Sequence, residues 1–198
     1  MSTSKRGAAY HHGDLRRVLL EGASELLETN QFSSIGLREA ARAAKVSPAA
    51  PYRHFRNREA LLAAVAARGF ERLAAALSGV RDAPEGDRLR VMGRAYLDFA
   101  LAHRNLFRLM FSSEISKDDH ADLRTASQQA MEALQSAMRS KGVESAREAA
   151  VGAWALVHGL AQLLVDDQLS KDLTAGPARE RLISVITDVY GAGLRRRR

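Results

Sequence analysis

The segment from residue 35 to residue 62 constrains the fold of this 198-residue chain most, because it has room only for short helices around a tight turn. Apolar residues recur there with the i, i+3, i+4, i+7 spacing of one helical face: Leu37, Ala40, Ala41 and Ala44. Residues 45–47 are too few for anything but a tight turn. Ser47 suits a helix N-cap and Pro48 suits the first helical position, so the pattern predicts a second helix over 48–54.

This second helix carries three neighbouring side chains that form hydrogen bonds, Tyr52, Arg53 and His54. A short helix, a tight turn and a polar second helix are together typical of a helix-turn-helix that reads the DNA major groove. Tyr52 and His54 can bond phosphate oxygens or base edges, and Arg53 can contact guanine or a phosphate. For Phe55 we expect packing inside the unit. Arg38, near the start of the first helix, is a further phosphate candidate.

The same residues resemble the DNA-binding unit of the TetR family of transcriptional regulators. The matching text is Ala40–Ser47, then Tyr52–Phe55, then Arg58–Leu62, within a resemblance that covers residues 12–70. Downstream, Trp154–Gly159 is similar to the tryptophan-to-HisGly signature of the C-terminal domain called WHG. The resemblance implies an N-terminal three-helix DNA-binding head and a larger C-terminal helical domain that binds a ligand and dimerises.

The resemblance also implies where DNA is contacted. In the family, contacts to bases and methyl groups cluster at the start of the recognition helix, which here holds Ser47, Pro48 and Ala50, and Arg58 resembles a phosphate-binding Lys or Arg. Phosphate contacts set affinity and salt dependence, whereas base contacts set sequence choice. The full predicted DNA-binding set is Arg38, Ser47, Pro48, Ala50, Tyr52, Arg53, His54 and Arg58.

The chain departs from the family pattern within this unit. Glycine usually stands where this chain has Lys45 and Ala49, so Lys45 would have to tolerate a left-handed conformation that glycine accepts more readily. Pro51 replaces the usual aliphatic residue, and proline is tolerated only in the first turn of a helix. We therefore expect a short, 3₁₀-like first turn in the recognition helix.

Charge is distributed unevenly along the chain, whose formal net charge is +7. Residues 1–68 carry eleven Lys and Arg against six Asp and Glu, whereas residues 69–194 carry fifteen against seventeen. A basic N-terminal third fits a DNA-binding head, and solvated surface charge is the plain alternative. We predict a DNA-binding domain over 1–60 and a regulatory and dimerisation domain over 61–198. A basic arm could reach DNA or be a disordered tail: Lys5, Arg6, Tyr10, His11 and His12.

Only four prolines interrupt the chain, and no alternating strand pattern of useful length occurs, so the predicted fold is all-α. The predicted helices span 12–29, 37–44, 48–54, 58–78, 87–103, 103–111, 120–140, 144–169 and 177–193, with a polar loop over 112–119. The last two have broad apolar faces that one core cannot bury, which indicates a homodimer seam. By resemblance, the family pairs these helices into a four-helix bundle. The predicted seam residues are Leu160, Leu163, Ile186 and Val189.

Aromatic residues and methionines of the body share helical faces that could line a pocket for an apolar ligand. Tyr96 and Phe99 are spaced i, i+3, and Trp154 and His158 are spaced i, i+4. Plain core packing is the alternative for each of them, and the resemblance favours a cavity, with His158 as its polar group. The predicted ligand-binding residues are Met92, Tyr96, Phe99, Phe107, Met110, Phe111, Trp154 and His158.

Other function classes find little support. The absence of cysteine excludes disulfides and thiol catalysis. There is no GxSxG, glycine-rich phosphate loop or HExxH, and the histidines are scattered, so we expect no enzyme activity, cofactor or metal site. No N-terminal apolar run precedes a cleavage site, and no apolar stretch is long enough to span a bilayer, so we expect a cytoplasmic protein without membrane association.

The sequence therefore predicts a homodimeric, ligand-responsive transcriptional regulator, most often a repressor by family resemblance. It would bind a palindromic operator in double-stranded DNA, and a small, largely apolar effector in the body would release it. The alternative is a helical ligand carrier or a small enzyme without DNA binding.

Overall fold

The computed structural model describes residues 12–80, 83–84, 87–140 and 145–195, and within these ranges it contains helices and no strand. The predicted all-α fold is confirmed. The basic arm over residues 5–12 lies outside the described residues except for the backbone of His12. In chain order the elements are α1 (His12–Thr29), η1 (Phe32–Ser34), α2 (Leu37–Ala43), η2 (Ala50–Arg53), α3 (Arg58–Ser78), α4 (Arg88–Ala102), α5 (Arg104–Met110), α6 (Ala121–Ser140), α7 (Ala146–Val165), α8 (Lys171–Thr174) and α9 (Pro177–Arg195).

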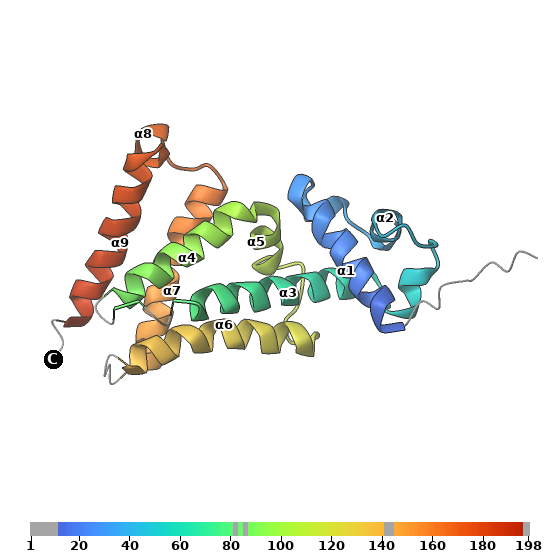
Figure 1. Ribbon diagram of the computed structural model, residues 1–198, viewed down its shortest axis with the longest axis horizontal. Coiled ribbons are helices and arrows are strands. Elements are labelled where there is room, and N and C mark those ends of the chain that lie inside the picture. Colours follow the sequence, from blue (N-terminus) through green and yellow to red (C-terminus); the bar gives the residue numbers. More distant parts are fainter. Residues whose placement is uncertain (1–11, 81–82, 85–86, 141–144, 196–198) are drawn as a thin grey trace, which may run out of the picture.

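The molecule is elongated, with a small head at one end and a larger body (Figure 1). The head consists of α1, η1, α2, η2 and the start of α3. Helix α3 continues from the head into the body, where α6 lies alongside it. Helix α4 packs against both α7 and α9, and α9 stands at the end of the body farthest from the head (Figure 1). The head and the body therefore share one long helix.

Close packing of small residues holds the head together. Ala40 and Ala41 of α2 are buried against α1, as the apolar stripe predicted. A Cβ added at Gly22 of α1 would lie 3.0 Å from the Ala44 backbone nitrogen and 3.2 Å from the Ala40 carbonyl oxygen. A side chain at position 22 would thus force α1 and α2 apart, so glycine permits their close approach.

Most helix boundaries match the sequence prediction within a few residues, and local signals explain why. The Asn57 side-chain oxygen accepts a hydrogen bond from the Ala60 backbone N–H at 2.8 Å, which caps the start of α3. Lys45 adopts φ 55°, so its predicted left-handed conformation is confirmed. Helix α7 ends at Val165 rather than at the predicted residue 169, and Asp167 follows it with φ 51°.

Two features of the helices differ from the prediction. The recognition segment was predicted as a helix over 48–54, but it is the single 3₁₀ turn η2, in line with the expected effect of Pro51. Helix α7 is long and apolar enough, by length and composition alone, to cross a membrane, so the statement that no stretch could do so was wrong. Only 28% of its most apolar window is buried within the subunit.

One continuous hydrophobic core runs from the head into the body. It extends from Leu19 and Phe55 in the head, through Val65 and Phe70 of α3, to Phe107 of α5. The predicted domain boundary between residues 60 and 61 falls inside the first turn of α3, so no linker separates the two parts there. Helix α3 therefore belongs to both parts and connects the body directly to the head.

Candidate functional site

One side of the turn η2 is buried in the head, and the other side is exposed to solvent. Pro51 within η2 and Phe55 just after it are buried, and hydrogen bonds close the backbone of the turn at both ends. The Ala50 N–H donates to the Ser47 carbonyl at 3.0 Å, and the N–H groups of His54 and Phe55 both donate to the Pro51 carbonyl at 2.9 Å. Proline lacks an N–H and prefers a helix start, so its place in the first turn costs no backbone bond.

Most of the predicted DNA-binding residues of the head lie on its surface. Tyr52 is 56% exposed, and Arg53 beside it is exposed as well. Arg38, Ser47 and Pro48 are also exposed, whereas Ala50 is partly buried. Three further basic side chains, outside that predicted set, lie at the surface of the same small unit: Arg42, Lys45 and Arg56.

His54 is placed differently from its neighbours. Its side chain is partly buried, and its Nε2 atom is buried with no hydrogen-bond partner among the described residues. In this conformation Nε2 does not face solvent, so a contact between this atom and DNA requires the ring to turn. An unsatisfied buried polar atom costs about 1–3 kcal/mol, which favours such a rearrangement when a partner arrives.

Arg58 forms hydrogen bonds within the head in this structure, and its predicted phosphate contact stays a prediction. Its Nε donates to the Ile35 carbonyl at 2.8 Å, and its Nη2 donates to the Phe32 carbonyl at 2.7 Å. These bonds tie the segment that precedes α2 to the first turn of α3. Arg58 thereby positions the reading unit on α3, and its Nη1 lies 3.9 Å from the Glu114 carboxylate of the body.

The body holds a cavity of about 290 Å³ between α3, α4, α6, α7 and α9. Of the predicted ligand-binding residues, Met92, Tyr96, Phe111 and Trp154 line it. The other four do not line it. Phe99, Phe107 and Met110 are buried in the core, and His158 stands behind Tyr96. For those three residues the structure shows core packing, and their predicted contact with a ligand stays a prediction.

A chain of polar contacts stands behind the cavity wall. The Trp154 indole N–H can only donate, so it donates to the Tyr96 hydroxyl oxygen at 3.3 Å. The same hydroxyl oxygen lies 2.9 Å from His158 Nδ1 and can donate its hydrogen to it. Burial raises the pKa of Tyr96 well above its usual value. Burial, and then the positive charge of Lys117, lowers the pKa of His158, which favours a neutral imidazole.

Sequence reasoning missed several residues of the cavity. Lys117 lines it from the segment between α5 and α6, which was predicted only as a polar loop. Ser127, Gln128 and Thr187 are further polar groups of the lining. No spacing rule marks Lys117, because it reaches the cavity through the fold of an irregular segment.

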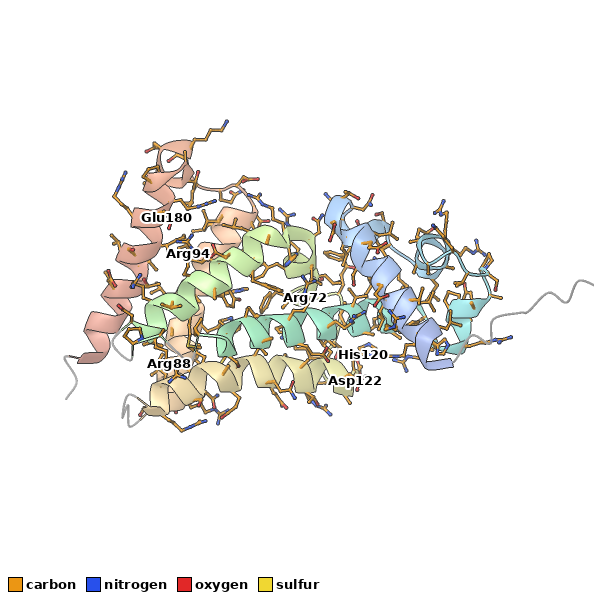
Figure 2. The ribbon with its side chains drawn as sticks, in the orientation of Figure 1. Arg72, Arg88, Arg94, His120, Asp122 and Glu180 are labelled. Atoms are coloured by element: carbon orange, nitrogen blue, oxygen red, sulfur yellow. The ribbon has the colours of Figure 1, made fainter. Side chains whose placement is uncertain are left out.

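The segment over residues 112–120, here called the α5–α6 connection, contacts both the cavity and the head. Lys117 reaches the cavity, and His120 Nε2 lies 3.1 Å from Glu59 Oε1 in the first turn of α3. Figure 2 shows His120 where the starts of α3 and α6 meet beside the head. Glu114 of the same segment lies opposite Arg58. A ligand that displaces this segment would act directly on the base of the head.

Helix α5 makes a second link between the body and the head. Arg104 and Arg108 both donate to the Val165 carbonyl at the end of α7, at 3.1 and 2.7 Å. The Asn105 side-chain N–H donates to the Leu27 carbonyl near the end of α1 at 3.0 Å. These bonds satisfy carbonyls that the helix ends leave free. They also join α1 of the head to α7 of the body through one short helix.

An exposed apolar face lies on α7 and α9. Of the predicted seam residues, Leu163 is 42% exposed and Val189 is 66% exposed, whereas Leu160 is only 4% exposed and packs in the core. Ile186 is partly buried and lines the cavity. Further exposed apolar residues of the two helices are Val151 and Leu156 of α7 and Val185 of α9, and Leu156 also lines the cavity. Leu160 and Ile186 thus belong to the subunit interior more than to its surface.

Two family models match the chain in the parts described above. Residues 19–65 match the model described as "Bacterial regulatory proteins, tetR family", and residues 89–189 match "Tetracyclin repressor-like, C-terminal domain". Together with the fold, these matches define an all-helical DNA-binding regulator with a helix-turn-helix head and a ligand-binding body. The chain belongs to the TetR family of transcriptional regulators, as the sequence resemblance indicated.

Solved structures share this architecture. A protein of unknown function from Rhodococcus sp. RHA1 is 34% identical, with a TM-score of 0.78 over 94% of this chain and 98% of that one. A tetR-family regulatory protein from Rhodococcus RHA1 is 18% identical (TM-score 0.64, covering 89% and 97%). The TetR-family regulator PfmR from Thermus thermophilus is 20% identical (TM-score 0.61, covering 88% and 96%). The last two likenesses show the fold alone. No curated protein matches the chain.

Within the described ranges, no group of three or more His, Asp or Glu side chains lies close enough together to hold a metal ion.

Proposed function

We propose that the protein is a cytoplasmic, homodimeric repressor that binds a palindromic operator and leaves it when a small effector enters the body. The observation that carries this proposal is the α5–α6 connection, because one short segment touches both the cavity and the base of the head. Two distinct sites joined by a shared element are the minimum that ligand control of DNA binding requires. An effector acts only if it binds the DNA-free arrangement more tightly than the DNA-bound one.

DNA binding is supported by charge and exposure in the head. Basic side chains at the surface surround the turn η2, among them Arg38, Lys45, Arg53 and Arg56. Each cation that neutralises a phosphate releases counterions, so affinity for any duplex should fall as salt rises. Tyr52, exposed and fixed above the buried Pro51, is the side chain we expect to contact a base edge or an ordered phosphate.

Dimerisation is supported by the unburied apolar face of α7 and α9. A second copy of the chain is the occupant we propose, because a palindromic operator requires two heads related by twofold symmetry. Helices α7 and α9 both pack on α4, and both carry exposed apolar side chains that a second copy could cover. An obligate interface of this kind buries roughly 2,000 Å² or more in total.

The test measures DNA binding with and without the reading side chain. DNA that flanks the protein's own gene supplies candidate operators, and fluorescence anisotropy gives affinity at several salt concentrations. We expect the logarithm of the association constant to fall by about 0.9 per phosphate contact for each unit in the logarithm of salt concentration. Tyr52→Ala should weaken operator binding by about 1–3 kcal/mol; a base contact leaves binding to random duplex nearly unchanged, whereas a phosphate contact weakens it as well.

Two outcomes would count against the proposal. If the protein shows no salt-dependent affinity for random duplex DNA, the result supports the alternative, a helical ligand carrier or a small enzyme. If the Tyr52 variant binds the operator like the parent, η2 is not the reading element.

A further inference from the structure

Lys117 brings an ammonium group to the edge of the cavity. Its Nζ lies 4.9 Å from the centroid of the Phe70 ring and 5.7 Å from that of Phe111, and both rings line the cavity. The residue as a whole is exposed, but partial burial of its ammonium lowers the pKa of Lys117. Aromatic faces attract the cation and hold it over the cavity wall.

Among the described residues, this ammonium has no anionic partner. No carboxylate forms an ion pair with Lys117 in the part of the chain that the structure describes, and burial is the only cause of its shifted pKa. The other polar groups of the lining are neutral: Ser127, Gln128, Tyr96, Trp154 and Thr187. Among the described residues that line the cavity, Lys117 therefore carries the single charge, which is positive. A partly desolvated charge without a partner favours binding of an ion of opposite sign.

The rest of the cavity suits hydrocarbon. Leu73 and Leu77 of α3 face Met92 of α4 and Met131 and Leu134 of α6 across it. Methionine side chains adapt to the shape of an apolar ligand. The volume of about 290 Å³ lies just below the range of roughly 300–1,000 Å³ for small-molecule pockets. The occupant is therefore small.

We propose that the effector is a small carboxylic acid, whose carboxylate pairs with the Lys117 ammonium and whose hydrocarbon body fills the cavity between α3, α4 and α6. One lysine balances the one charge of a carboxylate, whereas a phosphate carries more charge and is better matched by arginine forks. That this ligand controls DNA binding rests on the proposed function, whereas the carboxylate site does not depend on it. Lys117 belongs to the same α5–α6 connection as His120, which contacts Glu59. A carboxylate that pairs with Lys117 would therefore bind to the segment that contacts the head.

The test compares three probes that share one hydrocarbon chain and differ in the charge of the head group: octanoate, 1-octanol and octylammonium. Calorimetry measures their affinity, and fluorescence of Trp154, the chain's single tryptophan, reports entry into the cavity. Octanoate should bind about tenfold or more tightly than 1-octanol, and octylammonium should bind most weakly. Lys117→Met, which removes the charge and keeps much of the side-chain volume, should erase this preference.

Matched variants make the test specific. Lys117→Arg should restore the preference for octanoate. Lys171→Met, at an exposed lysine of α8 remote from the cavity lining, should leave it unchanged. Circular dichroism confirms that each variant is folded. Equal affinity of the parent for octanoate and 1-octanol overturns the proposal, as does unchanged octanoate binding by Lys117→Met, or no binding of hexanoate, octanoate or decanoate.

These failures differ from a failure of the proposed function. A neutral effector would leave DNA binding and its release intact while overturning the carboxylate proposal. Conversely, a ligand-free protein that does not bind DNA contradicts the proposed function, even if octanoate binds through Lys117.

Discussion

Lys45 holds a backbone conformation that residues other than glycine seldom adopt, since its φ is 55°. This conformation costs an L-residue roughly 1–2 kcal/mol, and the greater freedom of glycine in the unfolded chain offsets roughly 0.5–1 kcal/mol of that. Lys45→Gly should therefore raise the free energy of unfolding by up to about 1 kcal/mol, as measured by urea denaturation. The same change removes a surface charge of the head, so DNA affinity should fall.

Lys45→Asn separates the two effects, because asparagine tolerates the left-handed region but carries no charge. It should weaken DNA binding like the glycine variant while remaining closer to the parent in stability. A loss of stability in Lys45→Gly would contradict the left-handed turn.

Arg58 and Arg56 stand two residues apart and should behave in opposite ways. Arg58→Ala leaves the Ile35 and Phe32 carbonyls without their donor, which should cost about 1–2 kcal/mol of stability at this half-exposed site. It should leave the salt dependence of DNA binding unchanged. Arg56→Ala removes an exposed cation, so stability should change by less than about 0.5 kcal/mol and the salt slope should shrink by about 0.9. Denaturation and anisotropy at several salt concentrations measure both quantities.

The reverse pattern would show that Arg58 turns towards phosphate when DNA binds, as the sequence resemblance implied. Sequence text alone could not decide this, because Arg58 finds its carbonyl partners 23 and 26 positions earlier in the chain.

At the scale of the element, α7 and α9 allow a sharp test of assembly. Val185 is 59% exposed and Val189 is 66% exposed, so Val185→Glu or Val189→Glu should place a charge in the proposed seam and give a folded monomer. Leu160→Glu puts the same charge into the subunit core and should unfold the protein. Light scattering gives the mass, and circular dichroism gives the helix content. A monomeric parent at micromolar concentration contradicts the proposed dimer.

The long helices were predictable because each carries its own signals. Helix α1 has an apolar stripe over its whole length, and α3 begins at a capping asparagine. Helix α8 has only four residues and no periodicity to detect. At the early end of α7, Arg104 and Arg108, which are far away in sequence, both donate to the last carbonyl of the helix, that of Val165. The spacing of residues within a helix does not reveal partners that lie far away in the sequence.

At the scale of the whole molecule, stability should depend on pH through two histidines. Burial lowers the pKa of both His158 and His103 below the value near 6.5 that they have in the unfolded chain. As pH falls below about 6.5, the unfolded chain takes up protons that the folded protein does not, so the free energy of unfolding should fall. The loss should stop below the folded pKa values, and each histidine contributes at most about 1.4 kcal/mol per pH unit.

Urea denaturation between pH 5 and pH 7.5 measures this dependence. His158→Gln should make the profile shallower, and the further change His103→Gln should flatten it. The pKa of Asp166 is lowered from 3.8 by hydrogen bonds from Gln162 and Arg108, so its contribution is lost only in more acidic solution. Stability that rises as pH falls from 7 to 6 would contradict the neutral state of His158.

Half of the predicted cavity residues proved to line it, and packing between helices explains the division. Spacing places Tyr96 and Phe99 on one broad face of α4, but of the two only Tyr96 lines the cavity. Phe107 packs against the rings of Tyr96 and His158 behind the wall. Periodicity tells which residues turn inward, whereas the position of a void depends on where neighbouring helices fail to touch.

The α5–α6 connection has a consequence for how such a protein responds to selection. In a reporter strain, substitutions at Lys117 should give a regulator that its inducer no longer switches off. Substitutions at Glu114 or His120, which face Arg58 and Glu59, should change expression when no inducer is present. Opposite phenotypes would then map to one short stretch of the gene. A lineage that acquires a new inducer could adjust recognition and response together, through neighbouring codons.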